Sequence, residues 1–508
     1  LAWIGLGRTD QQRLLAKASG LASDAAASAL FAGRPERAVE VLEQARAVLF
    51  TGEWQWTADV AALRAIAPDL ADQLTDIREQ LGGQLVDESA SGLLDAARGA
   101  GANADARMAL GRRWDEAVDA ARRLPGLVAF LRDRPSPVLE LPENSAAVIV
   151  NVSRYRCDAL LITDHDVLAV PLGVSAREIA DVAVSHLVMQ SQHAYETSFK
   201  ATAPAAALAR EHSLTETLAW LWEHIARPVL DALGHTGPPA QGQPWPRVWW
   251  CPTSMLTHLP LHAAGGHESL GAAHGASDEP ARDSVMDRVV SSYTPTLRAL
   301  ATALTTPARH TEPRLLSVAP EPPDQRALPG AQREARALST WVSGARLTSL
   351  HGSQATVRAV KEALPHHTWV HFSCHGDQSI TDPSTGGLIL HDGRLTVADL
   401  VRARHPDSVL AFLAACKSAS GGAAVPDEVL TPAAAFQYAG FRHVIGTMWA
   451  IDDDAASDLT ERMYSDLFQH EPLDARDTAP ALHRAVRDMR NASPYRPSTW
   501  ASVVHLGA

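Results

Sequence analysis

The sequence predicts an α/β fold, a mostly parallel sheet with helices on both faces, preceded by an α-helical segment. From residue 313 the chain alternates short β-branched runs with helical stretches, and the short links between them favour parallel strands. Residues 1–135 are instead rich in alanine, leucine and arginine and contain few β-branched runs. The chain has 508 residues, a length typical of roughly two to four domains.

The composition restricts the class of protein. Hydrophobic residues make up 46% and charged residues 20%, as in folded globular proteins. The net charge is −13, which argues against nucleic acid as a main partner because phosphate binding needs a basic face. No run of ~18 apolar residues occurs, so no membrane span is expected. The first residues lack an initiator Met and a basic stretch before an apolar run, which predicts a fragment start rather than a signal peptide.

The four cysteines are Cys157, Cys251, Cys374 and Cys416. None belongs to a C-x-x-C pair, so neither a zinc site nor a thioredoxin-type site is expected, and no other cofactor or metal is indicated. Four thiols in a chain of this length do not make a disulfide scaffold, and a reducing cytoplasm fits best. In that compartment a single cysteine in a special place is a candidate nucleophile.

The helical front, defined as residues 1–135, contains one clear pair of helices within residues 22–48. Gly33-Arg34-Pro35 interrupts the pair, and small residues such as Ala26 and Ala38 allow the two helices to pack closely. This pattern fits a tetratricopeptide-like hairpin and fits a generic helical pair equally well. A second helical stretch runs from Trp114 to Leu124, and Pro135-Ser136-Pro137 predicts a domain boundary.

The pattern changes after this boundary. Three short β-rich runs predict a meander, two helical segments follow, and residues 265–284 predict an exposed loop. The runs are Ala146–Val152, Ala159–Thr163 and Val167–Pro171, the helical segments are 175–192 and 214–233, and Val248–Cys251 is a further strand. Beyond residue 313 the predicted strands are Leu315–Ala319, Arg346–Leu350, Thr368–Cys374, Val409–Ala415, Val444–Trp449 and Val503-Val504, with helices at Ala331–Val342 and Gln354–Leu364.

Two of these strands end in reactive side chains, His375 and Cys416. In a parallel sheet both strand ends lie at the same edge, so on neighbouring strands the imidazole can take the thiol proton and leave a thiolate. Gly376 allows close backbone approach, and its N–H and that of Cys416 are candidates for an oxyanion site.

Other interpretations of these residues remain open. A cysteine at a strand end is more often ordinary core, and Cys374 is a rival nucleophile, although it should point away from its neighbour His375. A tyrosine phosphatase would need an arginine six residues after its cysteine, where this sequence has Gly422.

Several segments, in this order, resemble the CHAT domain, a caspase-like peptidase domain found with tetratricopeptide repeats and related to separase and caspases. They are Leu328–Ala331, Val370–Gly376, Gly387–Leu390, Leu395-Thr396, Phe412–Cys416, Ala434–Gly440, Val444–Asp453 and Pro497–Gly507. The likeness covers roughly residues 140–508. It implies a caspase-like fold with His375 and Cys416 as a catalytic dyad, an N-terminal subdomain at 140–305 and a catalytic subdomain at 306–508.

Acidic residues near the site are candidates for a substrate pocket. Asp452 and Asp453 follow a strand and open a helix, where the simple role is helix capping and the functional role is binding a basic side chain before the cut bond, as in separase. Asp427 is a further candidate.

The sequence thus predicts a cytoplasmic cysteine endopeptidase that cleaves specific protein substrates. The resemblance implies a regulated pathway of bacterial defence or cell death, and the helical front is expected to bind a regulatory protein or domain. The alternatives are a catalytically silent caspase-like scaffold and an adaptor that processes only itself.

Overall fold

The structure is a computed structural model. It describes residues 6, 8–87, 96–132, 139–164, 166–199, 204–267, 283–305, 313–342, 344–378, 385–402, 405, 407–422, 426–469 and 477–508.

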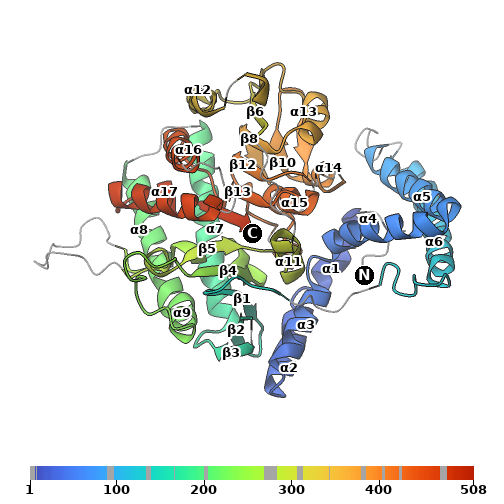
Figure 1. Cartoon of the computed structure of the whole chain (residues 1–508), viewed down its shortest axis with the longest axis horizontal. Helices are drawn as coiled ribbons and strands as arrows, with labels where there is room; N and C mark the ends of the chain where they lie inside the picture. The colour runs from blue at the N-terminus through green and yellow to red at the C-terminus, as the bar shows by residue number, and fades with distance from the viewer. Residues whose placement is uncertain are drawn as a thin grey trace, which may run out of the picture.

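An eleven-stranded sheet forms the centre of the molecule, in the order β3-β2-β1-β4-β5-β14-β13-β12-β8-β6-β7 (Figure 1). Its strands are β1 (Ser145–Val152), β2 (Cys157–Ile162), β3 (Val167–Pro171), β4 (Arg247–Pro252), β5 (Val290–Tyr293), β6 (Leu315–Pro320), β7 (Leu347–Gly352), β8 (Trp369–Ser373), β12 (Leu410–Ala414), β13 (His443–Thr447) and β14 (Val503–Gly507). A small second sheet contains β9 (Gly376–Asp377), β10 (Gly387–Ile389) and β11 (Arg394–Thr396).

The large sheet consists of two halves. The N-terminal half-sheet contains β1 to β5, with the predicted antiparallel meander β1-β2-β3 and the parallel pairs β1-β4 and β4-β5. The C-terminal half-sheet contains β6, β7, β8, β12 and β13, all parallel. The last strand, β14, pairs parallel with β5 and antiparallel with β13, and so joins the two halves. Strands that precede residue 305 and strands that follow residue 313 belong to this one sheet, and the predicted subdomain boundary between 305 and 306 stays a prediction.

Helices cover both faces of the C-terminal half-sheet, as the sequence predicts (Figure 1). Phe412 of β12 contacts Tyr464 on one face, whereas Phe372 of β8 contacts Phe436 on the other. The first face carries α12 (Pro329–Trp341), α16 (Asp453–Phe468) and α17 (Thr478–Ala492), and the second carries α13 (Val357–Ala363), α14 (Val397–Arg402) and α15 (Pro432–Ala439). Short 3₁₀ helices cover Ser254–His258, Leu261–Ala263, Gly344–Arg346, Leu364–His366 and Pro426–Glu428, and α18 covers Pro497–Trp500.

The helical front is confirmed, and its first hairpin packs directly on the sheet. Ala26, Ala38 and Leu42 are fully buried in one cluster with Ile149 of β1 and Trp249 of β4. The front consists of α1 (Arg8–Lys17), α2 (Leu21–Phe31), α3 (Pro35–Ala45), α4 (Val48–Ile66), α5 (Pro68–Asp87) and α6 (Ala96–Arg122). Its tetratricopeptide-like character stays a prediction.

The opposite face of the N-terminal half-sheet packs on the helices that follow the meander. Val148 and Trp250 share a cluster there with Ile179 and Ile225. These helices are α7 (Ala176–Phe199), α8 (Pro204–Leu221), the π-helix Trp222–Ala226 and α9 (Arg227–Ala232), and α10 (Val285–Arg288) and α11 (Leu297–Thr305) flank β5. Several predicted helix bounds were too short: α6 begins well before Trp114, and the segment predicted from 214 begins at Pro204.

Two predicted loop features fall largely outside the described residues. Pro135-Ser136-Pro137 lies there entirely, and of the predicted loop 265–284 only the two ends are described. Those ends, Gly265 and Ser284, pair with each other in an antiparallel bridge.

Candidate active site

Cys416 and His375 follow neighbouring parallel strands. In the pairing of β12 with β8, Phe412 lies opposite His371 and Ala414 opposite Ser373, so continuing the register by two residues brings Cys416 beside His375. The rings of Phe412 and His371 lie 4.7 Å apart on the α16 face of the sheet. Because side chains alternate along a strand, we expect Cys416 and His375, just beyond the strand ends, on this same face.

Cys374 directly follows β8, and by the alternation of side chains it belongs to the sheet face opposite that of His371. Its side chain is 2% exposed. Burial raises the pKa of its thiol far above the ordinary range, as expected for a thiol within the core. The structure therefore separates the two cysteines that the sequence left as rivals.

Gly376 packs against the backbone of Cys416. A Cβ atom at this position would lie 2.2 Å from the carbonyl oxygen of Cys416, so no larger residue fits without displacement of one of the two segments. Gly376 pairs with Leu388 of β10, while the Ile389 N–H donates to the His375 carbonyl at 2.9 Å. In this pattern Gly376 occupies a non-hydrogen-bonded position of the ladder, and its N–H points away from β10.

The turn after Cys416 is held by the end of β13. Lys417 has a φ of 56°, in the left-handed region that a side chain adopts at a cost. The Thr447 N–H donates to Ser418 Oγ at 2.9 Å, and Thr447 Oγ1 donates to the Ala415 carbonyl at 2.8 Å. Three parallel strands, β8, β12 and β13, thus fix the segments on both sides of the thiol.

The imidazole of His375 is oriented by a backbone carbonyl. Its Nε2 atom lies 2.7 Å from the carbonyl oxygen of Arg326, in the segment between β6 and α12. A carbonyl oxygen only accepts hydrogen bonds, so Nε2 carries the proton and Nδ1 keeps a lone pair. His375 therefore presents the tautomer that can act as a base through Nδ1.

The surroundings of Cys416 favour the protonated thiol over the thiolate. Burial raises the pKa of Cys416, and the Asp452 carboxylate acts in the same direction, while the N–H of Ile451 and the charge of Lys417 partly offset this. Among the described residues there is no hydrogen bond between Cys416 and the imidazole of His375. Proton transfer from this thiol to the imidazole would require the two side chains to approach each other.

The three predicted pocket aspartates lie in different surroundings. Asp452 is exposed, lies near enough to raise the pKa of Cys416, and its Oδ2 is 3.5 Å from Arg496 Nη2. Asp453 accepts a hydrogen bond of 2.5 Å from the Gly330 N–H, at the first turn of α12. The carboxylate thus caps a neighbouring helix rather than its own, a contact that links the starts of α12 and α16.

Asp427 lies at the junction with the helical front. Its Oδ1 accepts from the Ser254 N–H at 2.9 Å and lies 3.7 Å from Arg46 Nε, and its carbonyl accepts from the Ala47 N–H at 3.1 Å. Arg46 is buried and also donates to the Pro252 carbonyl at 2.7 Å. This side chain therefore belongs to an interface, apart from Asp452 and Asp453.

A buried polar network below the site was missed in the sequence. Glu334 Oε2 of α12 lies 2.8 Å from His371 Nε2 and accepts from Ser373 Oγ at 2.5 Å, and Tyr464 OH lies 3.3 Å from His371 Nδ1. All four side chains are buried. Two polar residues at alternate positions of an apolar strand, His371 and Ser373, were the available signal. The network ties the end of β8, and hence His375, to α12.

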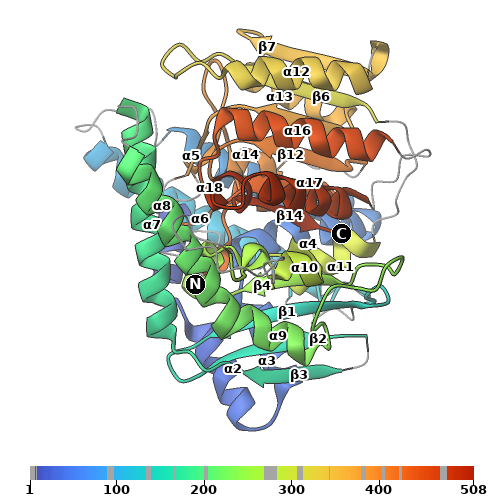
Figure 2. The same ribbon diagram turned by 90° about the vertical axis from the view of Figure 1, so that its left-hand side faces the viewer.

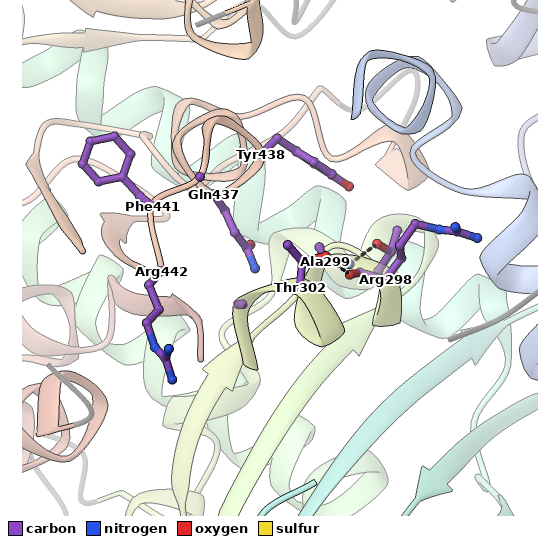
Figure 3. A pocket seen from close by; sticks show the side chains of 10 residues that line it. Arg298, Ala299, Thr302, Gln437, Tyr438, Phe441 and Arg442 are labelled. Atoms are coloured by element: carbon purple, nitrogen blue, oxygen red, sulfur yellow. Dashed lines mark hydrogen bonds between the residues drawn. The ribbon is translucent and has the colours of Figure 1, made fainter. Parts of the chain in front are cut away.

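Not every hollow in the described part of the chain includes a member of the dyad. A small one of about 30 Å³ lies between α11 and α15, where Gln437 extends from α15 toward α11 (Figure 3). It has room for little more than a water molecule. In the described part of the chain, no group of three or more His, Cys, Asp or Glu side chains is arranged to hold a metal ion. None of the helices described is long and apolar enough to cross a membrane.

The mostly parallel sheet with helices on both faces is the caspase-like fold that the sequence predicts. The family model of the CHAT domain matches residues 215–508, more than half of the chain, and the chain belongs to the CHAT domain family.

Similar solved structures include two peptidase systems. The separase–securin complex of Saccharomyces cerevisiae shares 9% identity over 93% of this chain and 37% of that chain, with a TM-score of 0.49. The complex of the Porphyromonas gingivalis RgpB pro- and mature domains shares 11% identity over 58% of this chain and 68% of that chain, with a TM-score of 0.34. This chain thus spans little more than a third of the separase chain. A comparison with curated protein sequences gave no match.

Proposed function

We propose that the protein is a cysteine endopeptidase in which Cys416 is the nucleophile and His375 the base. The observation that carries this proposal is the joint placement of the two residues at the ends of β12 and β8, with Gly376 packed on the Cys416 backbone. A core cysteine would need neither an oriented imidazole nor a glycine at this distance.

The reaction follows from the groups present. Nδ1 of His375 takes the thiol proton, and Sγ of Cys416 attacks the carbonyl carbon of the cut peptide bond. The C–N bond then breaks, and the imidazolium returns its proton to the departing amine. Water hydrolyses the remaining thioester, with His375 accepting the proton of the water and then restoring the thiol.

The negative oxygen formed during attack needs hydrogen-bond donors. The N–H of Gly376 points away from β10, and the N–H of Cys416 belongs to the turn held by Thr447. These two donors support the predicted oxyanion site, because backbone N–H groups fixed by strands need no reorganisation during the reaction.

For substrate choice we retain Asp452 as the candidate partner of a basic side chain before the cut bond. It is exposed and close to Cys416, whereas Asp453 and Asp427 are bound to backbone N–H groups. Burying the Asp452 charge against a guanidinium in a bound substrate would favour arginine or lysine.

A regulatory role of the helical front fits its contact with the segment after Cys416. Arg46 and Ala47 bind Asp427, which lies between Cys416 and α15. A partner protein on the front would therefore act on the loop that carries the nucleophile. We assign the protein to the cytoplasm and to a bacterial defence or cell-death pathway, in which such control is expected.

A fluorogenic peptide library tests this function. The intact chain should cleave a subset of peptides, and Cys416→Ala should cleave none. A silent scaffold would cleave no peptide, also after addition of a partner, and a self-processing adaptor would cut only its own chain, as seen by mass spectrometry.

A further inference from the structure

A groove of about 670 Å³ begins at His375 and runs between α12 and the edge strand β7. Ser349 and His351 of β7 line one side, and Gln332 and Arg336 of α12 line the other. Figure 2 shows α12 lying along β6 and β7 at this end of the sheet. The volume is in the range of ligand-binding pockets.

The position of this groove relative to the dyad indicates which half of a substrate it can hold. It includes His375, and Cys416 is not among its lining residues. The group that protonates the departing amine must lie on the side of the departing chain, whereas the acyl half stays on the thiol. A groove that starts at the imidazole is therefore placed to hold the segment after the cut bond.

The charged side chains that line the groove favour an acidic peptide segment. Arg326 and Arg336 are exposed, and neither guanidinium has a hydrogen bond or ion pair with any residue that the structure describes. By contrast, Arg333 on the same helix pairs with Asp454. Glu321 is the one carboxylate among the lining residues, so the groove is positive in a chain whose net charge is −13.

We propose that this groove binds the substrate segment that follows the cut bond and that Arg326 and Arg336 select acidic side chains in it. The inference rests on the proposed peptidase function, which it deepens. From Pro329 to Arg336 the helix rises by about 10 Å, equivalent to about three residues of extended chain. Arg336 therefore contacts a substrate side chain roughly three residues or more beyond the cut bond.

A binding experiment tests the groove without cleavage. Fluorescein-labelled peptides of Gly and Ser carrying two Glu, two Gln or two Lys residues are titrated into the full chain with Cys416→Ala, and anisotropy gives the Kd. The Glu peptide should bind about 10-fold more tightly than the Gln peptide. Arg336→Glu should remove this preference and favour the Lys peptide, whereas Arg358→Glu on α13, which does not line the groove, should leave it unchanged. Equal Kd values for the three peptides would overturn the proposal.

A second measurement separates this inference from the peptidase function. The active chain is given a coumarin amide, which has nothing after the cut bond, and a quenched peptide with Glu residues after it. Arg336→Glu should raise the KM of the quenched peptide about 10-fold and leave the coumarin amide unaffected. Cleavage that is insensitive to Arg336→Glu would refute the groove while the peptidase stands. Charge-selective binding without cleavage of either substrate would refute the peptidase while the groove stands.

Discussion

Each half of the large sheet has a cysteine near the end of a parallel strand, and the two cysteines differ in what covers them. Cys251 of β4 is 0% exposed, its sulfur lies 3.0 Å from Arg46 Nη1, and the hairpin of α2 and α3 packs over it. Cys416 after β12 is half-buried, beside the exposed Asp452 and opposite His375. Burial raises the pKa of both thiols.

This comparison indicates that the covering layer, rather than the strand order, decides where chemistry is possible. Parallel sheets offer sites at the carboxyl ends of their strands. In the N-terminal half-sheet the helical front occupies that position and supplies a guanidinium to the thiol. In the C-terminal half-sheet the corresponding edge keeps a groove, an imidazole and a glycine.

The largest expected effect separates the two cysteines by activity. Cys416→Ala should lower kcat/KM for peptide cleavage by at least about 10³-fold, because the nucleophile is lost. Cys251→Ala should leave kcat/KM within about 3-fold, since its thiol cannot reach a substrate. Circular dichroism should show both variants folded.

Cys374→Ser is the matched control for this experiment, because Cys374 is as close in sequence to His375 as a cysteine can be. By alternation its side chain lies on the face of β8 opposite that of His371, so most activity should remain. Equal losses from Cys374→Ser and Cys416→Ala would contradict the assignment of the nucleophile.

The next effect concerns stability and the helical front, which packs on the N-terminal half-sheet. Arg46→Ala removes a buried guanidinium and leaves Asp427 without its ion-pair partner, which should lower the free energy of unfolding by about 3 kcal/mol. Thermal unfolding followed by circular dichroism measures the change in Tm. Arg34→Ala at the exposed end of the same hairpin should leave Tm nearly unchanged. A stable Arg46→Ala protein would mean that the front is only loosely attached.

A smaller effect on activity is expected at Gly376, beside Cys416. Gly376→Ala places a methyl group 2.2 Å from the Cys416 carbonyl oxygen and must displace one of the two segments. Loss of the oxyanion geometry should reduce kcat by about 10²-fold with little change in KM. Gly393→Ala, where the added carbon has only a contact of 3.6 Å, is the control and should retain activity.

The smallest effect per residue concerns the pH dependence of stability and the buried histidines around the N-terminal half-sheet. Burial lowers the pKa of His186, His258 and His267 to about 4. The unfolded chain takes up these protons near pH 6.5, so between pH 6.5 and 4 the unfolded state binds more protons and stability falls as the pH falls. Each histidine contributes up to about 1.4 kcal/mol per pH unit.

Tm measured between pH 7.5 and 5.5 checks this expectation, and His258→Leu should make the decline shallower. A Tm that rises on acidification would contradict the neutral state of these side chains.

The sequence predicted most of the strands and the pair His375 and Cys416, because apolar β-branched runs and the residues that end them are adjacent in the chain. Asp453 was a candidate for the substrate pocket or for capping its own helix, yet it binds Gly330, more than 100 residues away. Asp427 was assigned to a pocket and is held by Arg46 of the front. Such contacts depend on how helices pack over the sheet, which local periodicity does not specify.

The place of β14 also bears on how the protein is made. It is the last strand in the chain order, and it alone connects β5 with β13. During translation the two half-sheets therefore cannot merge until Val503–Gly507 have left the ribosome, and until then each presents an unpaired strand edge. Premature termination upstream of Val503 would release a chain with two such edges, which would be prone to aggregate and to be recognised by chaperones or proteases.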